Sequence, residues 1–291
     1  MGQRKQPSIY AVLRVCFVFA VLIPGLSESK THSPESLAST ALETDLYQDR
    51  AWLALGHYRQ PKFRTKWVSD VDDPSFFLAP TGATNPKAEL RASIVALFTE
   101  SPRAAQLRCQ FPARWHWLQT RLNHFVTSTA DGCEEFERWR DELGATAATL
   151  VFPAAYLDSP SSMFGHTLLT LNKSSELDQS QILSYSVSYA AKRNEDDSEL
   201  SFIYRGLVGG YPGETAILPY YLKIREYSEI ESRDIWEYRL RLNDEQILQI
   251  VRHLWEIKDL RIDYYFFSEN CSFRLLAVSY THLTLPTICS V

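Results

Sequence analysis

The sequence predicts an α+β fold, in which a small helical domain precedes an antiparallel sheet packed on helices. Apolar residues recur at helical spacing through much of residues 45–143. From Gly144 onward the chain changes to short alternating runs, which are typical of strands with one face in a core. Two further helical patterns follow, at residues 245–257 and 271–278, and we expect the sheet to pack against these two helices.

Length and composition narrow the classes of function. The 291 residues suffice for one large domain or two small ones, and the net charge of −5 is mild. No basic stripe with interleaved aromatic residues occurs, which argues against nucleic acid as a partner. No HExxH or paired CxxC spacing occurs either, so the sequence indicates neither a metal nor a cofactor.

The first 44 residues are typical of an exported protein. Residues 1–29 have the features of a signal peptide: basic residues, an apolar stretch at 15–23, and a small-residue cleavage site at 27–29. The alternative is an uncleaved N-terminal anchor. Residues 30–44 are polar and rich in Ser and Thr, so we expect a linker there.

The helical domain is predicted at residues 45–143. Helices are expected at residues 46–58, from residue 85 onward, at 109–125 and at 133–143, with an extended segment at 62–71. No convincing catalytic group occurs in this part.

Export implies an oxidising compartment, where cysteines tend to pair. Cys109 and Cys133 lie at the two ends of one helical segment, and their local spacing suits a disulfide. Cys289 belongs to a tail discussed below, so Cys271 is left unpaired. An odd free cysteine in an exported protein indicates a reactive thiol.

The sheet domain is predicted at residues 144–278. Strands are expected at residues 145–152, 167–171, 181–190, 202–204 and 233–242. The glycine-rich run at residues 206–213 lacks the Lys-Ser/Thr pair of a phosphate-binding loop, so we interpret it as a flexible loop beside a cleft.

Cys271 is the candidate nucleophile. An aromatic run stops at Ser268-Glu269-Asn270, a sequence typical of turns and helix N-caps, and a helical apolar pattern follows. This places Cys271 in the first turn of a helix, where unpaired N–H groups and the positive end of the dipole favour a thiolate. The alternative is a small buried hydrophobic residue.

His166 is the candidate general base. Small residues, a Pro and Gly165 form a loop before it, and a β-type run follows, so His166 lies where a ring can point into a cleft. The alternative is a packed, hydrogen-bonded histidine.

The remaining catalytic roles are assigned by analogy with triads. The backbone N–H of Cys271 and the Asn270 side chain are candidate oxyanion donors. A third group should orient the His166 ring. Ser186 and Ser188 are the candidates from the neighbouring strand, and Asn172 is a rival.

The strings Met163-Phe164-Gly165-His166-Thr167 and Asn270-Cys271-Ser272 resemble the Lnb N-terminal periplasmic domain family of bacterial envelope proteins. Further matching strings lie at residues 185–191, 206–213, 219–221 and 231–238, so the resemblance covers roughly residues 145–278. Residues 52–58 and 109–114 look like the companion region that precedes this domain in relatives.

The resemblance implies a His and an Asn-Cys-Ser/Thr signature, which map to His166 and to Asn270, Cys271 and Ser272. The order of His before Cys resembles the circularly permuted, papain-like cysteine hydrolases of the NlpC-like group. It implies a helix that carries Cys packed on a sheet that carries His.

Two function classes follow. The first is a periplasmic or envelope thiol hydrolase or acyltransferase that acts on an amide or ester, such as cell-wall peptide or lipid. The second is a non-catalytic periplasmic binding or assembly module. Residues 279–291 resemble translated adapter sequence, so we expect a non-native tail. Membrane association through an uncleaved N-terminus or a missing C-terminal part stays open.

Overall fold

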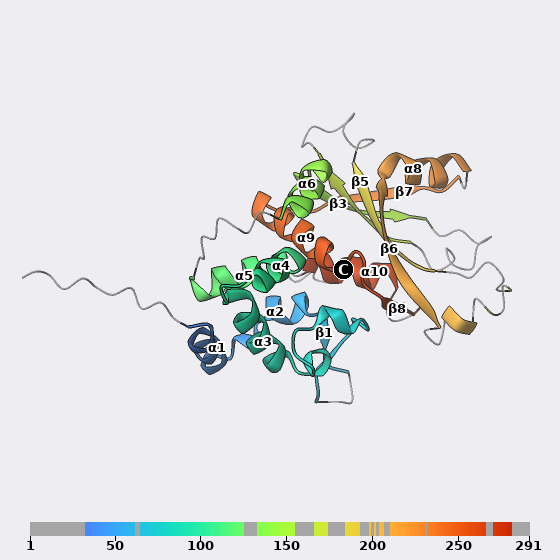
Figure 1. The fold of residues 1–291 in the computed structure, drawn as a ribbon. Helices are drawn as coiled ribbons and strands as arrows, with labels where there is room; N and C mark the ends of the chain where they lie inside the picture. The colour runs from blue at the N-terminus through green and yellow to red at the C-terminus, as the bar shows by residue number, and fades with distance from the viewer. Residues whose placement is uncertain are drawn as a thin grey trace, which may run out of the picture. The chain divides into compact units, whose positions relative to one another are not determined.

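The fold is α+β in the computed structural model, as predicted (Figure 1). The predicted signal peptide and residues 281–291 lie outside the described residues. The structure describes residues 33–61, 65–124, 133–154, 166–173, 184–192, 198, 201, 204–206, 210–230, 232–265 and 270–280.

Helices make up most of the N-terminal part. Its α-helices are α1 (Pro34–Glu43), α2 (Arg50–Leu55), α3 (Pro86–Phe98), α4 (Pro102–Gln110), α5 (Pro112–Leu122) and α6 (Glu134–Leu143). Short 3-10 turns lie at Leu46–Gln48, Pro74–Phe76 and Gly82–Thr84. Four of the α-helices begin with Pro, whose missing N–H would find no partner in a first turn anyway.

The prediction of a linker at residues 30–44 is wrong for α1. Ser33 caps this helix, since its hydroxyl accepts a hydrogen bond from the N–H of Ser36 at 3.2 Å. One face of the helix is apolar enough to enter the core despite the Ser and Thr residues around it. The buried residues of α1 are Leu37, Ala38 and Ala41.

Two predicted helices are each divided. The segment at 46–58 forms a 3-10 turn and α2, because the Asp49 carboxylate accepts from the Ala51 N–H at 2.8 Å and starts a new helix. Beyond Gly56 the chain forms strand β1 (Tyr58–Arg59), paired with β2 (Val68–Ser69). The segment at 109–125 divides at Pro112, which ends α4 and begins α5.

A six-stranded antiparallel sheet forms the second part. Its strands are β3 (Ala147–Pro153), β4 (Leu168–Asn172), β5 (Tyr185–Ala191), β6 (Tyr211–Pro219), β7 (Ile235–Arg239) and β8 (Ile262–Tyr264). The strand order is β7-β3-β4-β5-β6-β8. Strand β4 pairs with β3 and β5, so the segment that follows His166 enters the middle of the sheet.

Two local predictions for the sheet are wrong. The end of the glycine-rich run is the start of β6, and a side chain on Gly213 would overlap the Tyr189 ring on β5. The glycine is there because the two strands approach closely, rather than for flexibility. Residues 204–206 are helical, although a strand was predicted at 202–204; a run of three apolar residues does not distinguish the two.

The two faces of the sheet pack against different helices. Helices α9 (Asp244–Ile257) and α10 (Cys271–Tyr280) cover one face and share a core with the N-terminal helices, which confirms the predicted packing. Helix α8 (Tyr220–Ile224) and the π-helical segment Arg225–Ile230 contribute to a smaller apolar cluster on the other face. That cluster consists of Val151, Leu168, Tyr220 and Tyr227.

Candidate functional site

The first turn of α10 has the local structure that the sequence predicts. Cys271 is the first residue of the helix. The Asn270 side-chain oxygen accepts a hydrogen bond from the N–H of Phe273 at 3.1 Å, and its carbonyl accepts from the N–H of Arg274 at 3.1 Å. Asn270 is therefore the N-cap of the Cys271 helix.

Cys271 is the only free cysteine in the part of the chain that the structure describes. Cys109 and Cys133 form a disulfide, with their Cα atoms 5.3 Å apart, which confirms the predicted pairing. The Cys271 side chain is buried, with 3% of its surface exposed. The thiol therefore needs some opening of its surroundings before it can meet a large substrate.

Tyr264, on β8, is a polar neighbour of Cys271. Its hydroxyl lies beside both the side chain and the backbone N–H of Cys271. Burial, and then the nearby Cys271, raise the pKa of Tyr264. Its ring stacks on Tyr189 at 5.4 Å. Sequence reasoning noted Tyr264 only as part of an aromatic run, since nothing in that run marks one hydroxyl as a partner of the thiol.

One hydrogen bond connects the two predicted catalytic segments. The hydroxyls of Thr167 and Ser272 are hydrogen-bonded. Thr167 follows His166 in the chain, and Ser272 follows Cys271. The start of β4 and the first turn of α10 therefore lie side by side, although 105 residues separate the two hydroxyl-bearing residues.

The His166 ring lies in a different environment from the thiol. It is half-buried and packs nearly perpendicular to Tyr227, with the ring centres 6.2 Å apart. Burial, followed by the positive charges of Lys223 and Arg233, lowers the pKa of His166 to about 4. The ring is therefore neutral near pH 7.

His166 and Cys271 face opposite sides of the sheet. Leu168, two residues after His166, contacts Tyr227 in the smaller apolar cluster, whereas Leu169 belongs to the core that contains Cys271. Side chains two residues apart share a face of a strand. The structure thus brings the two chain segments together but not the two side chains, and no described hydrogen bond joins the ring to the thiol.

The predicted orienting residues also have other roles. Ser186 lies opposite Thr170, which places it on the His166 face, but its hydroxyl donates to the Leu218 carbonyl at 3.1 Å. Asn172 bonds to Thr149 at 3.2 Å and Ser184 at 3.3 Å.

Ser188 is buried on the same face as Ser186. Among the described contacts, neither serine nor Asn172 is hydrogen-bonded to His166.

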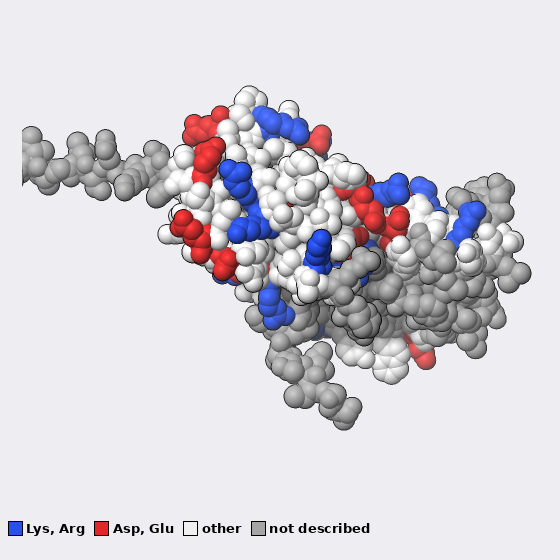
Figure 2. All heavy atoms as spheres, turned by 90° about the horizontal axis from the view of Figure 1, so that it is seen from below, with Lys and Arg blue, Asp and Glu red and all other residues white. Residues whose placement is uncertain are grey.

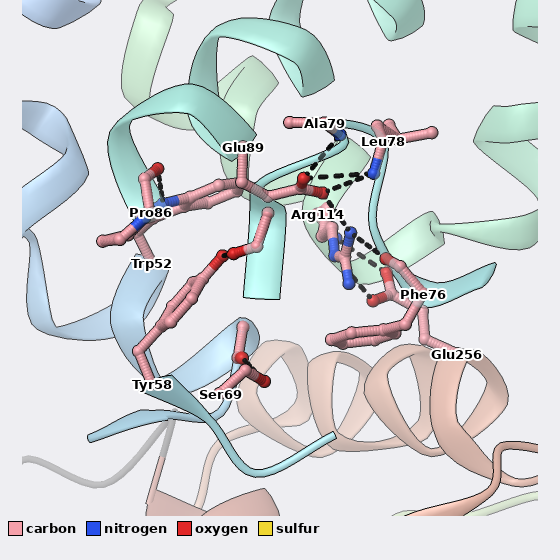
Figure 3. Close-up of polar contacts among 12 residues, drawn as sticks. Trp52, Tyr58, Ser69, Phe76, Leu78, Ala79, Pro86, Glu89, Arg114 and Glu256 are labelled. Atoms are coloured by element: carbon pink, nitrogen blue, oxygen red, sulfur yellow. Dashed lines mark hydrogen bonds and ion pairs between the residues drawn. The ribbon is translucent and has the colours of Figure 1, made fainter. Parts of the chain in front are cut away.

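A second polar centre, which we call the Arg114 cluster, consists of Arg114, Glu89 and Glu256 (Figure 3). All three side chains are almost completely buried. Arg114 donates to the Phe76 carbonyl at 2.9 Å and lies over the Phe76 ring, 3.9 Å from its centre.

The two carboxylates of the Arg114 cluster also bind backbone groups. Glu89 accepts from the N–H groups of Leu78 and Ala79, and Glu256 accepts from those of Ala113 and Arg114 at 2.7 and 2.9 Å. Glu256 belongs to α9, so it connects that helix to the N-terminus of α5. Sequence reasoning missed this cluster, because its members are far apart in the chain.

The described residues contain neither a helix that could span a membrane nor a metal-binding cluster. No described helix is both long and apolar enough to cross a membrane. No group of three or more His, Cys, Asp or Glu side chains in the described ranges is arranged to hold a metal ion.

Comparison with protein families gives two matches. The model of the Lnb N-terminal periplasmic domain matches residues 135–282, which include β3 to β8, α9 and α10. A model described as a domain of unknown function (DUF7843) matches residues 44–121, within the helical part. Neither the curated proteins nor the solved structures that were compared gave a match.

Proposed function

This chain belongs to the Lnb N-terminal periplasmic domain family, whose description indicates an exported envelope protein, and from this premise we propose that it performs thiol chemistry. In this proposal Cys271 is the nucleophile of a hydrolase or acyltransferase that acts on an amide or ester. Cell-wall peptide and lipid are the substrate classes that a periplasmic location offers.

The position of Cys271 is the observation that carries the proposal. Its thiol lies at the N-terminus of a ten-residue helix, where backbone N–H groups without a helical partner can donate to a developing oxyanion. In the same chain Cys109 and Cys133 are joined in a disulfide. A free thiol beside a helix N-terminus in an oxidising compartment is better explained by reactivity than by packing alone.

The reaction would proceed through a thioester. The sulfur attacks the acyl carbon, the thiol proton passes to His166, and the amine or alcohol leaves with that proton. Water or a second acceptor then releases the acyl group. The N–H of Cys271, which lies beside the Tyr264 hydroxyl, would donate to the developing oxyanion once the substrate displaces that hydroxyl.

This role requires His166 to change orientation. Because the two side chains face opposite sides of the sheet, the His166 side chain has to swing around the start of β4, while the bond between Thr167 and Ser272 keeps its segment beside α10. Because the His166 ring is neutral near pH 7, it can accept the thiol proton once the side chain has moved to Cys271.

A non-catalytic binding or assembly module is the second candidate function. Two observations favour it: the burial of Cys271 and the packing of His166 against Tyr227 on the other face of the sheet. In that case both residues contribute only to packing, as free cysteines commonly do.

Activity measurements on purified variants distinguish the two candidates. The substrates would be cell-wall peptide fragments and phospholipid, and the readout would be the released amine or acyl product. Cys271→Ala and His166→Ala should each abolish turnover while the melting temperature stays near that of the wild type. The double variant should lose no more activity, because the two residues act as one unit.

His116→Ala is the matched control, since His116 bonds Glu245 on the surface of the helical region. Iodoacetamide labelling near neutral pH, followed by mass mapping, should modify Cys271 in the native protein. Full turnover in either single variant, or a Cys271 that is labelled only after unfolding, would favour the binding module instead.

A further inference from the structure

A cleft of about 600 Å³ lies in the helical part, away from Cys271. It is bounded by α1, α3, α4 and the segment at residues 78–81, and no residue of the six-stranded sheet or of α10 lines it. Most of its wall is apolar and made of small side chains. The apolar wall residues from α3 and α4 are Ala88, Ala92, Val95, Ala96, Ala104 and Leu107.

Two arginines provide the positive charge of the cleft. Arg91 and Arg103 line it and are exposed, and Glu35 is the one carboxylate in the lining. Arg91 forms no ion pair among the described residues. Arg103 has only a 3.5 Å contact with the amide oxygen of Gln106. Neither guanidinium is neutralised by a carboxylate, so the cleft carries a net positive charge.

Two of the three hydroxyl groups in the wall, those of Thr99 and Ser101, already form hydrogen bonds within the protein. Thr99 donates to the Val95 carbonyl at 2.6 Å, and Ser101 accepts from the N–H of Ala104 at 3.1 Å. A ligand therefore meets an apolar surface and two guanidinium groups, rather than an array of uncharged donors and acceptors.

The face of the molecule seen from below carries few charged side chains (Figure 2). Figure 2 shows a face that is mostly uncharged, with separate Lys and Arg side chains in it and Asp and Glu gathered toward its borders. Small ligands bind in clefts of this size, which are mostly apolar and contain a few polar groups that set the orientation.

From these observations we propose that the cleft binds an anionic amphiphile. One apolar chain lies along the alanine-rich wall of α3 and α4, and a carboxylate or phosphate head contacts Arg91 and Arg103. Guanidinium groups recognise both kinds of head by charge-assisted hydrogen bonds. The free amphiphile and the acyl chain of a phospholipid share this chemistry.

The proposal is tested on the full chain by calorimetric titration with dodecanoate and dodecyl phosphate. Dodecyltrimethylammonium, which has the same chain and the opposite charge, is the ligand control. We expect both anions to bind and the cation to bind at least about tenfold more weakly.

Three variants locate the binding. The double variant Arg91→Gln/Arg103→Gln should weaken dodecanoate binding by at least about tenfold, since both charge-assisted bonds to the head group are lost. Ala92→Trp should fill the cleft and abolish binding of both anions. Arg138→Gln, on the exposed face of α6, removes a similar charge elsewhere and should change nothing.

A second measurement distinguishes a phospholipid source of the ligand from a free amphiphile. Transfer of a labelled acyl chain from phosphatidylglycerol vesicles to the protein would support a lipid source, and binding of the monomeric anions alone would support a free amphiphile. Equal binding of the cation, or unchanged affinity in both the double arginine variant and Ala92→Trp, would overturn the proposal. Vesicle binding without any binding of monomers would overturn it as well.

Discussion

The Arg114 cluster and the first turn of α10 are both buried polar centres, but they differ in the number and charge of the contacts that hold their side chains. In the Arg114 cluster, Glu89 and Glu256 each contact the guanidinium as well as backbone N–H groups. At the α10 turn, the Tyr264 hydroxyl lies beside the Cys271 side chain, and the Tyr227 ring lies beside His166.

This difference separates structural roles from chemical ones. Buried charges that bind each other and the backbone lose much of their stabilisation when one partner is removed. A thiol with one hydroxyl partner can be replaced at small cost to folding. The Arg114 cluster therefore connects helices of the two parts, whereas the α10 turn can change its contacts during a reaction.

The largest expected effect is on the Arg114 cluster. Arg114→Met should lower the free energy of unfolding by about 3–5 kcal/mol, because it leaves two buried carboxylates without their positive partner. Urea denaturation measures this. Arg138→Met, at an exposed position, should cost less than about 0.5 kcal/mol. A loss below about 1 kcal/mol in Arg114→Met would show that the cluster is not a structural centre.

A smaller effect concerns pH and the location of His166. Its pKa is lowered from 6.5 to about 4, so between these values the unfolded chain binds a proton that the native ring does not. Stability should therefore fall as the pH falls from about 6.5 toward 4.

The variant His166→Gln isolates this contribution. It should be about 3 kcal/mol less sensitive than the wild type to the change from pH 7 to pH 4. His57, whose pKa burial lowers to about 3, titrates in the same direction in both proteins and cancels in the comparison. Identical pH profiles of the wild type and His166→Gln would mean that the His166 ring is not packed against Tyr227 in solution. The side chains of His166 and Cys271 would then no longer be held on opposite faces of the sheet.

The smallest effect concerns the N-cap of α10. Asn270→Ala should lower stability by about 1 kcal/mol, because the N–H of Phe273 loses its partner, and Asn270→Asp should retain most of it. The alanine variant should also change the rate at which iodoacetamide labels Cys271.

Asn243→Ala is the matched control for that variant. It removes the equivalent cap of α9, whose side-chain oxygen accepts from the N–H of Gln246 at 2.9 Å. It should reduce stability similarly without altering the labelling of Cys271. If both variants changed the labelling rate equally, general loosening, rather than the α10 turn, would control the thiol.

Local chemistry made several features predictable from the sequence alone. The α+β class follows from the change of apolar spacing at Gly144. The start of α10 follows from Asn270, whose side chain can satisfy an N–H three residues ahead. The pairing of Cys109 with Cys133 follows from their short separation of 24 positions in the chain. Each of these depends on residues that are close in the chain.

Other features depend on contacts between distant residues, and only the tertiary structure decided them. The His166 side chain lies on the Tyr227 face because β4 alternates its side chains from a register set by pairing with β3 and β5. Glu256 meets Arg114 across 142 positions of the chain, and no local pattern marks either residue. The sequence by itself determined which elements form, since hydrogen bonds and apolar spacing act locally, whereas packing between elements decided which side chains meet.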